Sequence, residues 1–138
     1  MTTLSPWINF NGNAEEAFNF YKSALGGTFT QITRFKDMGE PNPQLAAGEG
    51  EKIMQIILQT ADGSTLRGND VPSFMGTVSE NENRSKIHVA VSTKEETEQI
   101  AAELSEGGQV EVPLGDGTFA MFRDKYGIEW VVEFASNK

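Results

Sequence analysis

The sequence predicts an α+β fold made of two βαβββ modules, and two observations predict it. Each half of the 138-residue chain shows a strand pattern, a capped-helix pattern, a glycine pair and three more strand patterns, in that order. Glu15-Glu16 and Glu95-Glu96 lie 80 residues apart at the same place in this order, and Gly26-Gly27 and Gly107-Gly108 lie 81 residues apart. Duplication of one module is the simplest explanation. We therefore expect a single domain over residues 1–138, with module one at about 1–70, a connector at about 71–85 and module two at about 86–138.

The first module is expected to begin with a strand in which apolar and polar residues alternate, with Leu4 on its apolar face. Asn13 followed by Glu16 predicts the N-cap and the capping box of a helix. Gly26-Gly27 supplies the left-handed residue that ends this helix. The expected elements are a strand at 4–10, a helix at 14–25, strands at 28–35, 52–60 and 64–68, and a long loop at 36–51.

The second module repeats this plan. Ser92 or Thr93 is expected to cap its helix, with Glu95 and Glu96 at the capping-box positions. Gly107-Gly108 follows the helix, as the earlier glycine pair follows the first one. The expected elements are a strand at 86–91, a helix that ends at Glu106, and strands at 109–112, 118–123 and 128–134.

The charge and residue composition argue against several kinds of binding partner. Eleven basic and twenty acidic residues give a net charge of −9, which argues against nucleic acid and anionic lipid as partners. The chain has no cysteine, which excludes disulfides and thiolate metal sites. No apolar run approaches the roughly 20 residues of a membrane helix, and the first residues lack the basic and apolar regions of a signal peptide. We expect a cytoplasmic protein that does not bind a membrane.

Six short motifs, spread over essentially the whole chain, resemble those of the PhnB-like branch of the vicinal-oxygen-chelate superfamily, which includes glyoxalases, bleomycin-resistance proteins and dioxygenases. Together, in this order and spacing, they are a fairly specific match, whereas any one alone would be weak. The motifs are Asn11-Gly12-Asn13-Ala14-Glu15-Glu16-Ala17, Phe20-Tyr21, Gly26-Gly27, Gly107-Gly108, Val112-Pro113-Leu114 and Asp124-Lys125-Tyr126-Gly127-Ile128-Glu129-Trp130.

This resemblance implies a fold in which two curled mixed sheets, each with its helix outside, enclose a cavity. It also implies a homodimer. Some PhnB-like sequences carry a ubiquinone-methyltransferase label, for which the sequence offers no support. It shows no glycine-rich cofactor loop after a strand, and we expect no separate cofactor-binding domain in a chain of this length.

Metal-dependent relatives hold a divalent ion with His and Glu side chains from four strands, which leaves positions open for substrate oxygens. Carried over by the resemblance, the four positions fall near Ser5 and at Gln55, His88 and Val131. Only His88, the single histidine, is a good ligand, and a stable site normally needs three nitrogen or carboxylate ligands. We therefore expect no cofactor and no metal. If a divalent metal does bind, its ligands would be Gln55, His88 and Glu133, which requires a different strand register from the one in our alignment.

The strand pattern also predicts which side chains face away from the helices. If the apolar alternate positions pack on the helices, the opposite faces present a wall for a small molecule. The predicted ligand-binding residues are Trp7, Asn9, Gln55, Ile57, Arg67, His88, Phe119, Met121 and Glu133, with Val131 beside them, although the pattern alone leaves open which face Phe119 and Met121 occupy.

Two of these residues have alternative interpretations. Arg67 suits a carboxylate or phosphate, but it is equally compatible with an internal ion pair to Glu129 or Glu133. His88 is either a ligand contact or a buried, hydrogen-bonded strand histidine.

Three hypotheses of function follow. The first is a dimeric protein that binds a small, partly aromatic molecule without a metal. The second is a metal-dependent lyase, isomerase or dioxygenase-like enzyme. The third is a protein whose ancestral site has decayed, leaving a structural or interaction role. The sequence has no cysteine nucleophile, no Gly-x-Ser-x-Gly elbow, no His-Glu-x-x-His motif and no Walker loop that would favour other chemistry.

Overall fold

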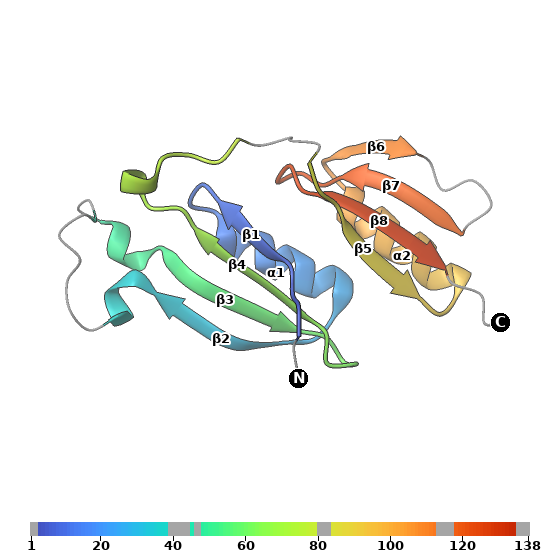
Figure 1. Ribbon diagram of the computed structural model, residues 1–138. Helices are drawn as coiled ribbons and strands as arrows, with labels where there is room; N and C mark the ends of the chain where they lie inside the picture. Colours follow the sequence, from blue (N-terminus) through green and yellow to red (C-terminus); the bar gives the residue numbers. More distant parts are fainter. Residues whose placement is uncertain (1–2, 39–44, 46–47, 80–83, 113–117, 135–138) are drawn as a thin grey trace. The chain divides into compact units, whose positions relative to one another are not determined.

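The structure is a computed structural model that describes residues 3–38, 45, 48–79, 84–112 and 118–134. The chain divides into two compact units, Met1–Val78 and Ser79–Lys138, and the boundary falls inside the predicted connector. Each unit consists of a four-stranded mixed sheet with one α-helix against it, as Figure 1 shows. The predicted α+β class and the two βαβββ modules are confirmed, and neither sheet closes on itself.

The first unit has the strand order β1-β4-β3-β2, in which β1 runs parallel to β4 and the other neighbours are antiparallel. The first strand of the module, β1, therefore lies at one edge of the sheet, and the last strand, β4, lies beside it in the interior. Its elements are β1 (Trp7–Phe10), α1 (Ala14–Leu25), β2 (Thr28–Arg34), β3 (Ile53–Gln59) and β4 (Thr65–Asp70), with short 3₁₀ helices at Phe35–Met38, Glu49–Glu51 and Ser73–Met75.

The second unit repeats this topology with the order β5-β8-β7-β6, and β5 runs parallel to β8. The matching strand orders are the structural counterpart of the duplication that the sequence predicts. Its elements are β5 (Ile87–Val91), α2 (Lys94–Ser105), β6 (Gln109–Val112), β7 (Phe119–Arg123) and β8 (Glu129–Phe134).

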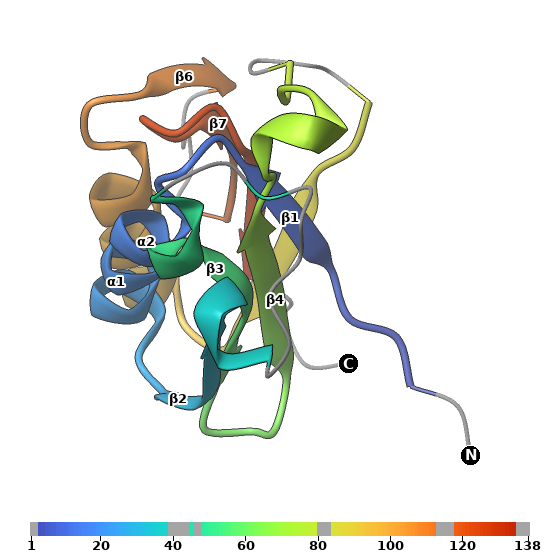
Figure 2. The same cartoon turned by 90° about the vertical axis from the view of Figure 1, so that its left-hand side faces the viewer.

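Helix α1 packs on one face of the first sheet and leaves the other face open, as the two views in Figures 1 and 2 show. The apolar stripe of the helix is fully buried against the strands. Phe18 lies at its centre, with its ring edge-on to that of Phe10 at 6.0 Å and to that of Tyr21 at 5.7 Å.

Helix α2 covers one face of the second sheet in the same way. Its buried residues include Ala101 and Leu104, and the strands contribute Phe122, Trp130 and Val132 to the core. Among the described residues, no helix is long and apolar enough to cross a membrane.

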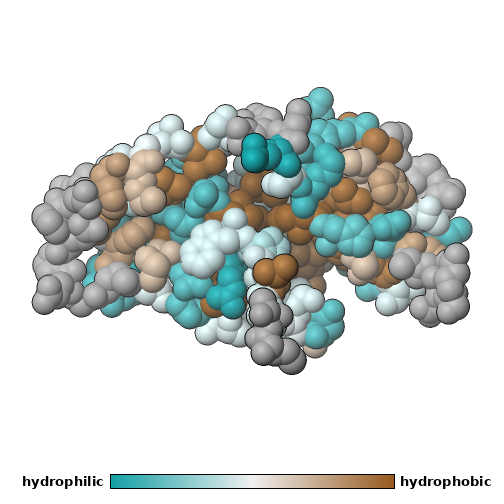
Figure 3. All heavy atoms as spheres, viewed as in Figure 1, coloured by the Kyte–Doolittle hydropathy of each residue, from teal (hydrophilic) through white to brown (hydrophobic). Residues whose placement is uncertain are grey.

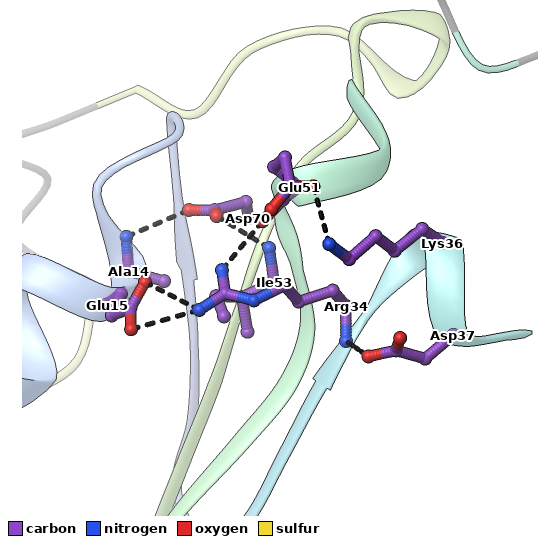
Figure 4. Close-up of polar contacts among 8 residues, drawn as sticks. All are labelled: Ala14, Glu15, Arg34, Lys36, Asp37, Glu51, Ile53 and Asp70. Carbon is purple, nitrogen blue, oxygen red and sulfur yellow. Dashed lines mark hydrogen bonds and ion pairs between the residues drawn. The ribbon is translucent and has the colours of Figure 1, made fainter. Parts of the chain in front are cut away.

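The predicted bounds of the first helix hold and Asn13 occupies its N-cap position as predicted, whereas the second helix ends at Ser105, one residue earlier than predicted. The Asn13 side chain makes no capping hydrogen bond. Asp70, at the end of β4, takes this role: its Oδ1 accepts a hydrogen bond from the Ala14 backbone N–H at 2.8 Å, and its Oδ2 accepts one from the Ile53 N–H at 2.9 Å (Figure 4). In the same cluster, Arg34 donates to both carboxylate oxygens of Glu15 at 3.0 Å. A side chain 56 residues away in sequence therefore replaces the local cap.

The second cap is confirmed. Thr93 Oγ1 accepts a hydrogen bond from the Glu96 N–H at 3.1 Å, and Glu96 Oε1 accepts one from the Ser92 N–H at 3.1 Å. The helix itself begins at Lys94, and Gly107 has the left-handed backbone (φ 77°) expected just after the helix end.

The predicted first strand is too long. Strand β1 begins at Trp7, and Leu4 is 93% exposed instead of lying on the buried face. The hydrogen bond from the Arg67 N–H to the Pro6 carbonyl starts the pairing with β4, so the residues before Pro6 have no partner strand.

Candidate functional site: the open faces of the two sheets

The open face of the first sheet carries the five site residues predicted in this unit. In the register of the sheet, Trp7 is paired with Arg67, and Arg67 is paired with Ile57 on the next strand. Asn9 is paired with Asn69. Paired residues point to the same side of a sheet, so these side chains form one surface across β1, β4 and β3. Figure 3, viewed onto this side, shows hydrophilic and hydrophobic residues next to one another.

Trp7 is held in place by a hydrogen bond. Its indole Nε1 donates to Asn69 Oδ1 at 2.6 Å, and Asn69 Nδ2 donates to the Asp70 carbonyl at 3.1 Å. The Trp7 side chain is nevertheless 48% exposed. A large flat ring in a fixed orientation that stays open to solvent is suited to contact a ligand.

The rest of this face is polar around one buried apolar side chain. Ile57 is buried although it faces away from helix α1. Gln55 Oε1 accepts a hydrogen bond from Gln31 Nε2 at 3.2 Å. Arg67 is partly buried, and among the residues that the structure describes its side chain makes no hydrogen bond or ion pair.

The open face of the second sheet brings together the other four predicted site residues. His88 and Met121 are both register partners of Val131, and Phe119 is the register partner of Glu133. The structure thus answers the question that the sequence left open: Phe119 and Met121 lie on the same face as His88 and Glu133. Phe119 is one of the exposed large apolar side chains of this unit.

His88 and Glu133 are in direct contact. The His88 Nε2 lies 2.9 Å from Glu133 Oε1, while the strand register pairs His88 with Val131. Glu133 therefore reaches His88 in the observed register, because its side chain extends back diagonally by one pleat. The interpretation of His88 as a buried residue is also wrong, because its side chain is 56% exposed.

Next to this pair lies a charged group that the sequence did not reveal. Glu129 is buried, its Oε2 accepts a hydrogen bond from Lys86 Nζ at 3.1 Å, and it lies 3.4 Å from Arg123 Nη2. Arg123 also lies 3.7 Å from Glu111. Lys86, Glu111 and Arg123 are each at least 12 positions apart in sequence, so only the register of the strands brings them together around Glu129.

The two carboxyls of this group have opposite pKa shifts. A hydrogen bond with Glu129, with a further contribution from burial, raises the pKa of Glu111 above its ordinary value of 4.5. Burial alone would raise the pKa of Glu129 too, but the hydrogen bond with Glu111 and the charges of Lys86 and Arg123 outweigh it and lower this pKa. Glu129 is therefore a structural anion that neutralises Lys86 and Arg123. It has its ion-pair partners within its own unit.

Metal ligands are sparse on these faces. In the described part of the chain, no three His, Cys, Asp or Glu side chains come together as a metal-binding group. Of the three ligands expected for a bound metal, Gln55 belongs to the first unit, and His88 and Glu133 belong to the second. The two that the structure shows in contact provide one nitrogen and one carboxylate donor.

With this geometry established, comparison with known proteins identifies the family. A family model described as 3-demethylubiquinone-9 3-methyltransferase, the PhnB-like family, matches residues 2–133. The chain belongs to the PhnB-like family. No curated protein is significantly similar to it.

Solved structures agree with this assignment. The protein PA1353 from Pseudomonas aeruginosa is 30% identical, with a TM-score of 0.81 over 99% of this PhnB-like chain and 100% of that one. The PhnB protein from Bacillus cereus is 21% identical, with a TM-score of 0.74 over 97% of this chain and all of its own. The fosfomycin resistance protein FosX from Listeria monocytogenes shares the fold alone, at 9% identity and a TM-score of 0.64 over 97% of this chain and 91% of that one. The predicted superfamily and its PhnB-like branch are confirmed.

Proposed function

We propose that this PhnB-like protein binds a small organic molecule on the open sheet faces and does so without a metal. Trp7 carries the proposal, because it is a half-exposed aromatic ring whose orientation is already fixed by Asn69. A contact group that is already fixed before binding loses less conformational entropy when the ligand binds. Each face has its own proposed ligand contacts, which are Trp7, Asn9, Gln55, Ile57 and Arg67 on the first sheet and, separately, His88, Phe119, Met121 and Glu133 on the second.

The chemistry of the faces supports binding more than catalysis. On the first sheet, carboxamides, the Trp7 ring and an aliphatic side chain surround a single charged group, Arg67, as in many small-molecule sites. The family is named for a methyltransferase, but the sequence has no glycine-rich loop between a strand and a helix that would hold a nucleotide-like cofactor. We therefore propose no methyl transfer.

The test uses the two tryptophans of the chain. Trp130 is almost fully buried in the second unit, whereas Trp7 is half-exposed. A library of small molecules is screened by thermal shift, and each hit is then titrated while tryptophan emission is recorded. Binding should raise the melting temperature and change only the long-wavelength emission of Trp7. The Trp7→Phe variant should lose this emission change, and the Trp130 emission serves as the internal reference.

A library without a single thermal shift would overturn the proposal and favour a decayed site. Hits that change the emission of Trp7→Phe as much as that of the natural protein would place binding elsewhere.

The contact between His88 and Glu133 favours a second candidate function, a metal-dependent enzyme, because a histidine and a carboxylate in contact are two ligands of a common metal site. Elemental analysis, followed by titration with nickel, zinc, manganese and iron, tests this candidate. A stoichiometric ion that is lost in both His88→Ala and Glu133→Gln would make the enzyme the better proposal. Absence of binding at micromolar metal would leave the metal-free site.

We also propose that the protein is a cytoplasmic homodimer, of which the resemblance implies the dimer. Light scattering coupled to size-exclusion chromatography should give about twice the mass of 15.1 kDa. A mass of one chain over the whole micromolar range would contradict the dimer.

A further inference from the structure

We propose that the ligand is an organic anion with a flat ring, whose negative group binds Arg67 and whose ring packs on Trp7. This inference rests on the proposed binding function and adds the chemical class of the ligand. It is carried by three observations on the first sheet: the state of Arg67, the absence of acidic side chains from the described open face of this sheet, and the position of Trp7.

Arg67 is a partly buried cation on the open face of the first sheet. Among the described residues its guanidinium has neither a hydrogen bond nor an ion pair. The other arginine of the same sheet, Arg34, shows the usual solution, with both oxygens of Glu15 at 3.0 Å and the Glu51 carbonyl at 2.8 Å. A guanidinium has five donors in a rigid fork, so Arg67 offers unused donors at a site that is already partly desolvated.

None of the described strand residues on the open face of this sheet is acidic. The four strands of this sheet include one acidic residue, Asp70, and its carboxylate is bound to backbone N–H groups on the helix side. The open face instead carries amide and hydroxyl side chains, although the protein has 20 acidic residues and a net charge of −9. In such an acidic protein, a face that bears a single cation and no anion is electrostatically matched to an anionic ligand. The side chains of this face, besides Arg67 and Trp7, include Asn9, Thr28, Gln31, Thr33, Gln55, Ile57, Gln59, Thr65 and Asn69.

Trp7 lies beside Arg67 on the neighbouring strand, in direct register. The Cα atoms of such neighbours are about 5 Å apart, so one small molecule can contact both side chains. The hydrogen bond to Asn69 fixes the indole, and the buried Ile57 on the other side of Arg67 adds an apolar contact. A ligand that contains both a flat ring and an adjacent carboxylate, phosphate or phosphonate can therefore use both residues at once.

The experiment compares ligands that differ only in charge. The probes are naphthalene-2-carboxylate, naphthalene-2-carboxamide and 2-(aminomethyl)naphthalene, titrated by calorimetry into the natural protein and into Arg67→Gln. Arg84→Gln is the matched control, because Arg84 is an exposed arginine of the second unit and its loss changes the net charge by the same amount. We expect the carboxylate to bind at least about tenfold more tightly than the amide. Arg67→Gln should remove this difference in affinity, whereas Arg84→Gln should preserve it.

The outcomes separate this inference from the proposed function. If the amide or the amine binds as well as the carboxylate, or if Arg67→Gln weakens all three equally, the ligand is not selected by its anionic group. The inference then fails while binding stands. If none of the three probes binds and the library described above yields only neutral or cationic ligands, the inference fails in the same way. If the library also yields nothing, both the inference and the proposed function fail.

Discussion

The carboxylate of Asp70 caps helix α1 from the far end of the module: its Oδ1 lies 2.8 Å from the backbone nitrogen of Ala14. The other oxygen binds the Ile53 N–H, and the side chain is 2% exposed. One residue thus joins the helix start to two central strands, β3 and β4. Asp70 therefore links helix α1 to the sheet through two buried hydrogen bonds.

Replacing Asp70 with alanine should lower the free energy of unfolding by about 2 to 4 kcal/mol, because two buried N–H groups lose their acceptor. Urea unfolding followed by circular dichroism measures this change. Asn13→Ala is the matched control: Asn13 occupies the N-cap position without capping, so its loss should change stability by less than about 0.5 kcal/mol. Equal losses in the two variants would contradict the role of Asp70.

This pair of residues shows where sequence reasoning reached its limit. The helix and its start were predictable from local chemistry, since the helical spacing of apolar residues and the glycine pair lie within a few positions of each other. The identity of the cap was not, because Asp70 is distant in sequence and reaches Ala14 only when β4 lies next to β1. Where the partner is local, as for Thr93 and Glu96, the sequence predicted the contact correctly.

For the candidate site too, local patterns were predictable from the sequence and contacts between strands were not. Strand periodicity placed Trp7, Arg67 and Ile57 on one face, because alternate residues share a side of the sheet. It could not assign Phe119 or the contact between His88 and Glu133, since both depend on the register between strands. Arg67 illustrates the remaining gap: the sequence offered Glu129 and Glu133 as partners, and the structure shows each of them bound to a neighbour within its own unit.

The pair His88 and Glu133 should contribute little to stability. Both side chains are about half exposed, and exposed ion pairs are typically worth less than about 1 kcal/mol. We therefore expect His88→Ala, Glu133→Gln and the double variant each to unfold within about 1 kcal/mol of the natural protein in urea. The comparison is Val132→Ala, a fully buried position on the other face of β8, which should cost more than any of them. A loss of about 2 kcal/mol or more in His88→Ala would make this histidine a structural residue instead of a site residue.

Gly68 is predicted to tolerate no side chain, because helix α1 packs directly on it. A Cβ at this position would lie 2.7 Å from Cε1 of Phe18, 2.9 Å from its Cζ and 3.0 Å from the Ile8 carbonyl oxygen. Since Phe18 is fully buried, its ring has little room to move. Gly68→Ala should therefore cost about 1 to 3 kcal/mol of stability through overpacking.

A double-mutant cycle tests this steric explanation. Phe18→Leu alone should destabilise the protein by leaving space beside Gly68. Combined with Gly68→Ala, the smaller side chain should relieve the clash, so that the double variant is more stable than the sum of the single losses predicts. Strict additivity in urea unfolding would show that Phe18 is not what excludes the methyl group.

Glu111 and Glu129 should each make the free energy of unfolding depend on pH, and in opposite directions. The folded-state pKa of Glu111 lies above its ordinary value of 4.5, since the hydrogen bond with Glu129 and partial burial favour the protonated form. Its contribution to stability is therefore fully present below about pH 4.5 and is lost as the pH rises through the folded-state pKa. Glu129, with a lowered pKa, has the opposite effect, and its contribution is lost as the pH falls through its folded-state pKa.

Glu111→Gln copies the protonated form at every pH. We expect it to raise the unfolding free energy at pH 7 by about 0.5 kcal/mol, a modest value because the side chain is partly exposed and solvent screens its charge. The gain should disappear below about pH 4.5, where the natural Glu111 is itself protonated. Glu98→Gln, an exposed position on α2, removes the same charge from the protein as a whole and serves as the control. Urea unfolding at pH 4 and pH 7 measures the unfolding free energy of both variants. An equal increase in Glu98→Gln would assign the stabilisation to net charge. A decrease in Glu111→Gln at pH 7 would show that the ion pair with Arg123 outweighs the repulsion from Glu129.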